Sequence, residues 1–355
     1  MSKPSLSKAI ENYKSKSSLE KRNAWIDFFT HNALYIVIAI LIIYVTIKFP
    51  TFLSPVSLID ILRKAAAKLP LALGVGGVII LTGTDLSVGR TVGLTACIAA
   101  SLLQKMDYPS KMFKSMQPWP IIGVLLLVLV VGGIVGIVNG FFVARFSLHP
   151  FVVTLATQMM LYGTVLMYVE LGGNAGKPIS GLSEKYSQFV KGNIIQLGEY
   201  SIPNYVLYAT LITLIIWVIW NKTTLGKNMY AVGSNPEAAN VSGVSVMKTT
   251  IIMFLIAGIL YGASGFIEAA RIGSNNAATG TAYETDAIAA CVIGGVSFSG
   301  GIGRISGVIT GVILLQLVTV ALQWLSVSVN LTYIIKGAII LFACAIDMQK
   351  YLQKK

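Results

Sequence analysis

The chain has 355 residues, of which 55% are hydrophobic and only 12% charged, and its mean hydropathy is +0.75. This composition excludes an ordinary water-soluble domain and is typical of a membrane protein. The formal net charge of +13 does not indicate nucleic-acid binding, because the basic residues form no stripe interleaved with aromatic side chains.

Ten stretches are candidate membrane spans, since a transmembrane helix needs roughly 20 mostly apolar residues. We therefore predict an all-α, polytopic membrane protein. Its spans lie near residues 33–50, 65–83, 88–104, 119–144, 150–170, 203–220, 249–270, 286–298, 303–325 and 331–348. The second, third and eighth are short or interrupted. The predicted organisation is a cytoplasmic tail at 1–32, a transmembrane domain at 33–348 with a cytoplasmic loop at 222–248, and a cytoplasmic tail at 349–355.

Basic residues set the expected orientation. They precede the first span, follow the last, and flank the loop at 222–248, at Lys222, Lys227 and Lys248. By the positive-inside rule these three regions are cytoplasmic, and both termini on one side require an even number of spans. Six other lysines break the rule, because this topology places them outside: Lys105, Lys111, Lys114, Lys177, Lys185 and Lys191.

Polar residues interrupt the apolar sequence within TGTDLSVGR. A charge at membrane depth is costly and normally faces a bundle interior or water. Asp85 and Arg90 are therefore candidates for lining a translocation path, where they would pair with each other or with helix ends. Alternatively, Asp85 caps a helix that begins near Leu86. Both interpretations stay open, since a cap inside a membrane can also line a path.

This design recurs about 215 residues later. Gly76-Gly77-Val78 precedes Gly89-Arg90, and Gly294-Gly295-Val296 precedes Gly303-Arg304. Interrupted hydrophobic segments at matching places indicate a transporter built from two related halves.

Two spans carry glycines at steps of four, a spacing that lets helix backbones approach closely. We predict packing roles for Gly132, Gly136, Gly140, Gly303, Gly307 and Gly311. Asn139 fits a polar contact between helices better than a substrate ligand.

The fifth span carries a polar stripe made by Thr154, Thr157 and Gln158. The stripe suits contacts to a sugar in a translocation path, and it suits hydrogen bonds between helices equally well. Farther along, Glu268 and Arg271 are spaced i, i+3, so we expect a surface ion pair.

The loop KTTLGKNMYAVGSNPEAANVSGVSVMK, residues 222–248, has the chemistry of a helix start. Ser234 and Asn235 can accept hydrogen bonds from free backbone N–H groups, and Pro236 suits the first turn. Glu237 favours the positive helix end, and Gly243 can close the unit. We predict a short helix presented outside the membrane.

The sequence lacks the motifs of an enzyme. There is no GxxxxGK[ST] and no HExxH, and two histidines are too few for a zinc centre. The three cysteines lie in or beside apolar spans and suggest no disulfide framework. We therefore expect no catalytic residue, metal or cofactor on this chain, and no ATPase activity of its own.

GSNPEAANVSGV, followed by a glycine-rich apolar span, resembles the coupling loop of bacterial ATP-binding-cassette (ABC) importer permeases for monosaccharides. TGTDLSVGR, CVIGGVSFSGG and YIIKGAII are similar to other signatures of the ribose/galactose branch, and the likeness runs from about Pro50 to the C-terminus. GTDLSVGRTVGL and DAIAACVIGGVSFSGG are most similar to permeases for galactose, methyl-galactoside and glucose.

The resemblance implies a multi-pass homodimer in the bacterial inner membrane. It also implies an ATPase subunit with two ABC cassettes, which binds ATP and magnesium, and a periplasmic or extracellular sugar-binding protein. In the family the coupling helix sits in a groove of the ATPase. The candidate coupling positions here are Gly233, Ser234, Asn235, Pro236, Glu237, Ala238, Ala239 and Gly243.

The alternative is an ion-coupled secondary sugar transporter or a facilitator that acts alone. It predicts sugar flux in vesicles that contain only this polypeptide, and tolerance of changes in the loop at 222–248. Co-purification with an ATPase distinguishes the two hypotheses.

Overall fold

The computed structural model describes residues 35–197 and 200–352. The predicted tail at 1–32 lies outside this range, and the last helix extends into the predicted tail at 349–355. The helices are Tyr35–Lys48, η1 (Pro50–Leu53), α3 (Pro55–Ile80), α4 (Val88–Leu102), α5 (Ile121–Phe146), α6 (Pro150–Glu170), η2 (Leu171–Gly173), α7 (Glu184–Lys191), α8 (Asn204–Lys222), α9 (Thr224–Ser234), α10 (Pro236–Val241), α11 (Val246–Ile272), α12 (Tyr283–Ile293), α13 (Ile305–Trp324) and α14 (Val329–Leu352). The strands β1 (Asn193–Leu197) and β2 (Tyr200–Pro203) form an antiparallel hairpin.

Each of the ten predicted spans overlaps a helix, so the prediction of an all-α membrane protein is confirmed. Within the described residues, five helices are long and apolar enough to cross a membrane: α5, α6 with η2, α8, α11 and α13. Helix α3 begins ten residues before the predicted span because Ser54 caps it and Pro55 occupies its first turn.

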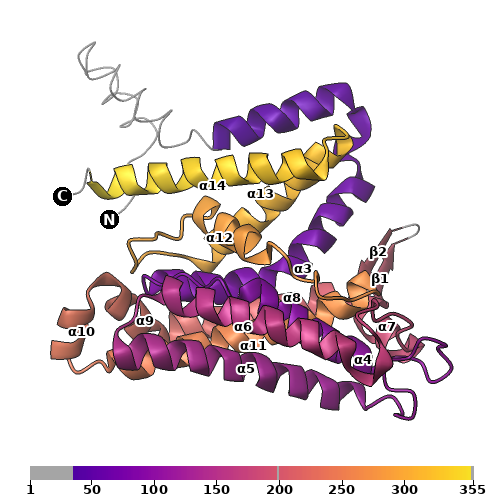
Figure 1. Cartoon of the computed structure of the whole chain (residues 1–355). Helices are drawn as coiled ribbons and strands as arrows, with labels where there is room; N and C mark the ends of the chain where they lie inside the picture. Colours follow the sequence, from indigo (N-terminus) through magenta and orange to yellow (C-terminus); the bar gives the residue numbers. More distant parts are fainter. Residues whose placement is uncertain (1–34, 198–199, 353–355) are drawn as a thin grey trace.

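Helix α11 is the centre of the larger lobe and packs against α3, α4 and α5 (Figure 1). In its most apolar window 72% of the residues are buried, against 28% for α5 and α8. The outer helices α5, α6 and α8 therefore present apolar side chains outward, as helices in contact with lipid do.

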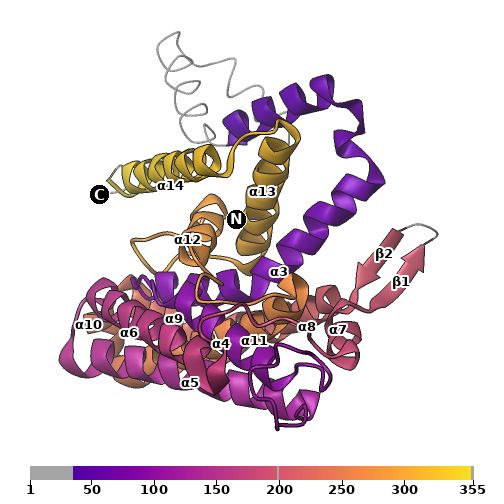
Figure 2. The same ribbon diagram turned by 45° about the vertical axis from the view of Figure 1, so that its right-hand side comes forward.

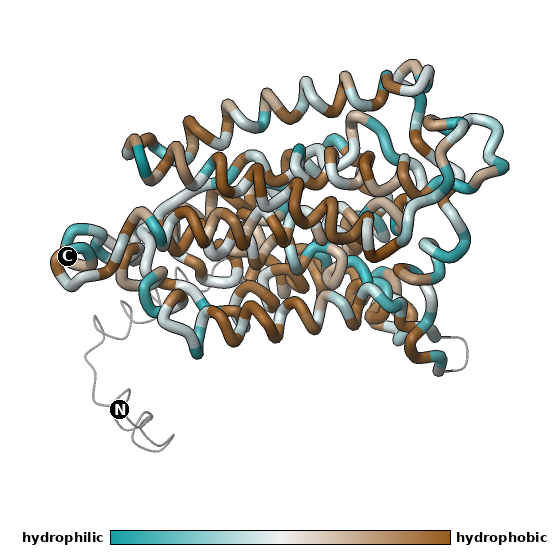
Figure 3. The backbone as a smooth tube through the Cα atoms, turned by 90° about the horizontal axis from the view of Figure 1, so that it is seen from below, coloured by the Kyte–Doolittle hydropathy of each residue, from teal (hydrophilic) through white to brown (hydrophobic). Residues whose placement is uncertain are grey.

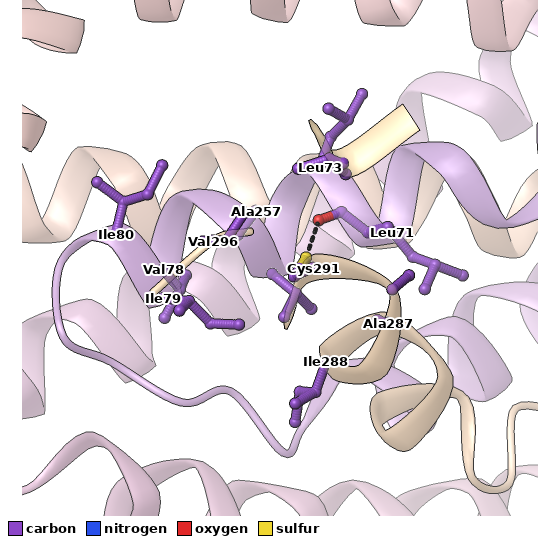
Figure 4. Close-up of a cluster of buried hydrophobic side chains, with 14 of the residues drawn as sticks. Leu71, Leu73, Val78, Ile79, Ile80, Ala257, Ala287, Ile288, Cys291 and Val296 are labelled. Carbon is purple, nitrogen blue, oxygen red and sulfur yellow. Dashed lines mark hydrogen bonds between the residues drawn. The ribbon is translucent and has the colours of Figure 1, made fainter. Parts of the chain in front are cut away.

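A smaller lobe contains the helix Tyr35–Lys48, α12, α13 and α14 (Figure 2). Helix α3 belongs to both lobes. Its first half packs Ile61 against Val45 and Ala321 of the smaller lobe. Its second half enters the main core, where Leu71, Val78 and Ile80 meet residues of α11 and α12 (Figure 4).

Polar segments gather at the two ends of the helices, and hydrophobic residues occupy the lengths between them (Figure 3). Helices α9 and α10 and the carboxyl end of α14 lie at one end, and α7 with the β1–β2 hairpin lies at the other (Figure 1). At the hairpin end the loops are joined by backbone bridges, Gln104 with Leu182 and Ile179 with Asn275.

Candidate functional site

The interrupted segment TGTDLSVGR ends α3 at Ile80 and begins α4 at Val88. Asp85 lies between the two helices and is only 1% exposed. Its Oδ1 accepts hydrogen bonds from the backbone N–H of Ser87, at 2.9 Å, and from the Ser87 hydroxyl, at 2.6 Å. Because Ser87 is the N-cap residue of α4, the carboxylate of Asp85 orders the start of this helix. Asp85 is thus not the N-cap that the capping interpretation expected, because α4 begins two residues later than Leu86; it instead bonds the residue in the N-cap position, Ser87.

The hydrogen-bond network continues from Ser87 into α5 and α6. Asn139 donates to the Ser87 hydroxyl at 3.0 Å, and the Thr157 hydroxyl lies 2.6 Å from the Asn139 amide oxygen. Four side chains on three elements thus form one buried chain, and Asn139 makes the contact between helices that the sequence suggested.

The other members of the predicted polar stripe lie differently. The Thr154 hydroxyl donates to the carbonyl of Thr84 at 3.0 Å and accepts from the N–H of Leu86 at 3.1 Å. Gln158 is half-buried, and within the described residues its side chain makes no hydrogen bond. In this conformation the two threonines hold helices together, and Gln158 is the member of the stripe whose polar group has no partner in the described part of the chain.

Arg90 does not pair with Asp85, so that part of the prediction is wrong. Its guanidinium donates to the carbonyl of Ala277 at 2.9 Å and lies 4.2 Å from the ring centroid of Tyr162. Asp85 is already bonded within the start of α4, whereas Arg90 leaves α4 toward α6 and the 273–282 segment.

The loop at 222–248 contains two helices, α9 and α10. Asn235 caps α10, because its Oδ1 accepts from the N–H of Ala238 at 2.9 Å. Pro236 occupies the first turn, and Gly243, with φ of +84°, ends the unit by donating its N–H to Asn240. Ser234 ends α9 and makes no cap for α10, unlike its prediction.

The candidate coupling residues divide by exposure. Five consecutive ones are exposed: Ser234, Asn235, Pro236, Glu237 and Ala238. Gly243 is exposed too, whereas Gly233 and Ala239 are buried. Val241 is 90% exposed, which is unusual for so apolar a side chain at a polar end of the molecule.

Gly233, near the end of α9, lies where the loop at 222–248 contacts the two interrupted segments. A Cβ at this position would lie 1.8 Å from the carbonyl oxygen of Ile80, which itself accepts from the N–H of Gly301 at 2.8 Å. Nearby, the hydroxyl of Tyr230 donates to the carbonyl of Gly303 at 3.0 Å. Burial raises the pKa of the Tyr230 hydroxyl, which therefore keeps its proton.

A cavity of about 460 Å³, with both polar and apolar groups in its lining, opens beside this junction. It is lined by Tyr230, by Arg304 and Ser306 at the start of α13, and by glycines of the 294–304 connection. The first turn of α13 has no side-chain cap, so its free backbone N–H groups are available to a polar solute.

The predicted packing glycines lie at close backbone approaches. Added Cβ atoms at Gly132 and Gly136 would meet carbonyl oxygens of α11 at 2.2 and 2.1 Å. Gly140 faces Ile251 of the same helix at 2.9 Å. On α13, Gly307 and Gly311 face α12 at 2.1 and 1.9 Å, and the preceding Gly303 faces the side chain of Ile80 at 2.8 Å.

Sequence reasoning missed a set of charged residues between the two lobes. Glu268 is fully buried, so its 2.7 Å pair with Arg271 is not the surface pair that the spacing suggested. Asp286 of α12 pairs with Lys336 of α14 at 2.8 Å. The ammonium of Lys68 lies over the ring of Tyr283. The i, i+3 spacing of the first pair is visible in sequence, but a pair 50 residues apart leaves no local signal.

Apolar helices around buried polar segments, with capped helices projecting at one end, define a multi-pass membrane permease. Residues 57–344 match the family described as branched-chain amino acid transport system/permease component, and the chain belongs to this family. It is 44% identical to the galactose/methyl galactoside import permease protein MglC of Haemophilus influenzae, over 96% of this chain and 100% of that protein.

Two further relatives are similar to this chain over most of its length. The protein of the same name from Escherichia coli is 42% identical over the same shares of both chains. The ribose import permease protein RbsC of Bacillus subtilis is 34% identical over 88% of this chain and 90% of that one. No solved structure matches the chain.

Proposed function

We propose that this chain is the membrane-spanning permease subunit of an ABC importer that carries a monosaccharide into the cytoplasm, driven by a separate ATPase subunit. Galactose, methyl-galactoside or glucose is the proposed substrate. The relatives named for galactose and methyl galactoside are 42–44% identical to this chain, and the ribose relative is 34% identical.

The proposed assembly contains two copies of this chain, an ATPase with two ABC cassettes, and a periplasmic or extracellular sugar-binding protein. ATP and magnesium bind to the ATPase, and this chain binds no cofactor. We place both termini in the cytoplasm of a bacterial cell, with the protein in the inner membrane. The proximity of α9, α10 and the carboxyl end of α14 at one end supports this orientation (Figure 1).

The observation that carries the proposal is the junction at Gly233. An exposed, capped α10 is suited to binding in a groove of the ATPase. The end of α9, which directly precedes α10, lies against the carbonyl of Ile80 and the backbone of Gly301 at Gly233. Movement of α10 would therefore reach the ends of both interrupted segments without an intervening flexible loop. The transport step is a shift of population between gate states, with no covalent chemistry on the sugar.

The proposed path follows from the same contacts. Asp85, Arg90, Thr154, Thr157 and Gln158 border the first interrupted segment, and the 460 Å³ cavity borders the second. In the present conformation the two threonines and Asp85 are bonded to protein groups. A sugar hydroxyl would exchange with those bonds when the gate opens.

The test uses the chain together with its ATPase in vesicles. We expect Glu237→Lys, which reverses the charge of the exposed first turn of α10, to abolish ATP-driven galactose uptake and to weaken co-purification of the ATPase. Lys177→Gln, an exposed position in the loop at the opposite end of the molecule, is the control and should transport normally. Normal uptake by the Glu237→Lys protein, with unchanged assembly, would contradict the coupling role.

A second experiment addresses the alternative of a transporter that acts alone. Vesicles that contain only this polypeptide should show no concentrative sugar uptake and no response to an ion gradient. Saturable flux in such vesicles would favour a secondary transporter or facilitator instead.

A further inference from the structure

An apolar groove runs along the outer surface of the larger lobe, where α5, α8 and α11 diverge. Its volume is about 470 Å³. The floor is a stripe of α11 at helical spacing, formed by Ile256, Ile259, Ala263 and Ile267, and Ile215 of α8 stands on one wall.

The groove exists because its two walls pack elsewhere. Helix α5 is held against α11 by the close glycine contacts of Gly132 and Gly136. Helix α8 packs mainly against α3. The groove remains between them, over a stripe of α11 in which Ala263 and Ile267 are already largely buried by the groove walls.

A polar occupant does not fit this groove. The single polar side-chain atom among the lining residues is the Tyr208 hydroxyl, and it already donates to the carbonyl of Phe189 at 2.8 Å. A sugar in the groove would lose its hydrogen bonds to water without replacement, at a cost of several kcal/mol. The occupant must therefore be apolar.

The length of the groove suits a single hydrocarbon chain. From Tyr208 to Ile219 the groove follows α8 for ~16 Å, at ~1.5 Å per residue. That is about the depth of one leaflet of a ~30 Å hydrocarbon core, so one acyl chain can lie along it.

Positive charge lies at one mouth of the groove. Phe189 and Tyr208 mark this end, with ring centroids 5.5 Å apart. Lys185 is four residues before Phe189 on α7 and therefore shares its face. Lys185 is exposed and makes no ion pair with a residue that the structure describes.

We propose that this groove binds one acyl chain of an anionic phospholipid, with the headgroup beside Lys185. Under the orientation proposed above, the lipid belongs to the outer leaflet. Binding of an anionic headgroup would explain why Lys185 lies on the outer side of the membrane, against the positive-inside rule. It also supplies packing for α8 and α11 where the protein provides none.

The test is native mass spectrometry of the purified chain with added phosphatidylglycerol or phosphatidylcholine. Ala263→Leu fills the floor of the groove, and we expect it to lower retention of both lipids about tenfold. Ala156→Leu, the same change at an exposed position of α6 outside the groove, is the matched control and should retain lipid as the wild type does.

The charge at the mouth is tested separately. Lys185→Gln should reduce the preference for phosphatidylglycerol about fivefold, since a lysine near an anionic lipid surface contributes about 1 kcal/mol, while retention of phosphatidylcholine stays unchanged. Because Lys185 is exposed, this variant reports on the site even where Ala263→Leu fails to fold.

Three results would overturn the proposal. They are equal lipid retention by wild type and Ala263→Leu, an unchanged lipid preference in Lys185→Gln, and disulfide-linked dimers of Ile215→Cys in vesicles, which would mean that a second copy covers the groove. No sugar or ATPase is present in these measurements, so their failure is separate from failure of the transport proposal.

Discussion

The two interrupted segments share a sequence pattern but differ in how they are held. The 81–87 connection is fixed by side chains, because Asp85, Ser87 and Asn139 form a buried network that reaches α6. The 294–304 connection is rich in glycine and borders a cavity, and Gly295, Gly300 and Gly301 have φ between +66° and +79°. Related sequence patterns have thus produced one connection tied to α5 by buried side chains and one that is rich in glycine and borders a cavity.

This difference suggests a division of labour. The bonded connection keeps α4, α5 and α6 in register, whereas the glycine-rich connection can change shape at lower cost. Both touch the base of the 222–248 loop through Ile80 and Gly301. If the loop at 222–248 moves, we therefore expect the 81–87 connection to keep its shape and the 294–304 connection to change.

The largest effect is expected at the junction itself. Gly233→Ala places a methyl group 1.8 Å from a backbone oxygen, so the two connections must separate. We expect loss of ATP-driven uptake and a lower thermal midpoint of unfolding. Gly163→Ala is the matched control, because a Cβ at Gly163 meets nothing within 4 Å, and that protein should transport normally. Equal behaviour of the two variants would remove Gly233 from the mechanism.

An intermediate effect is expected in the bonded connection. Asp85→Ala leaves the N–H and hydroxyl of Ser87 buried without their acceptor, a loss of about 1–3 kcal/mol in the free energy of unfolding. Asp85→Asn keeps an acceptor oxygen and should recover much of that stability. Asp60→Asn, which breaks an exposed pair with Lys64, should change stability by less than ~1 kcal/mol. Chemical unfolding in detergent measures all three, and an Asp85→Ala protein as stable as the wild type would exclude the capping role.

The smallest effects are expected in α6, where two tests distinguish residues that hold helices together from residues that contact the sugar. In a double-mutant cycle of Asn139→Ala and Thr157→Val we expect a coupling of about 0.6 kcal/mol, with ~1.7 as an upper bound. Gln158→Leu should leave stability unchanged but raise the KM for uptake if its amide meets the sugar. An unchanged KM would assign Gln158 to the packing of α6.

Sequence was sufficient for features that are local. Apolar length located the helices, and the cap of α10 by Asn235 followed from the order of a few neighbouring residues. The α5 glycines could be predicted as packing positions from their spacing alone. In each case the physical cause lies within one or two turns of the chain.

Sequence was insufficient where partners are distant along the chain. From sequence alone Glu268 was predicted to lie at the surface, whereas α3 and α12 bury it in the structure. Asp286 and Lys336 are 50 residues apart and come together only in the folded chain. The contact of Gly233 with Ile80 joins residues 153 positions apart. Helical periodicity carries no information on such contacts, so the junction at Gly233 was not predictable.

Helix α3 passes through both lobes as a single helix that contains Pro70 and changes direction between its two halves (Figure 1), and its length is therefore a register constraint. Each residue of an α-helix adds ~1.5 Å of rise and ~100° of rotation. Removing one residue between Ile61 and Leu71 would therefore turn one lobe about the other and misalign every contact that depends on both. A substitution in this helix changes the contacts of one residue, whereas an insertion or deletion changes the rotation and distance between the two hydrophobic cores that the helix joins.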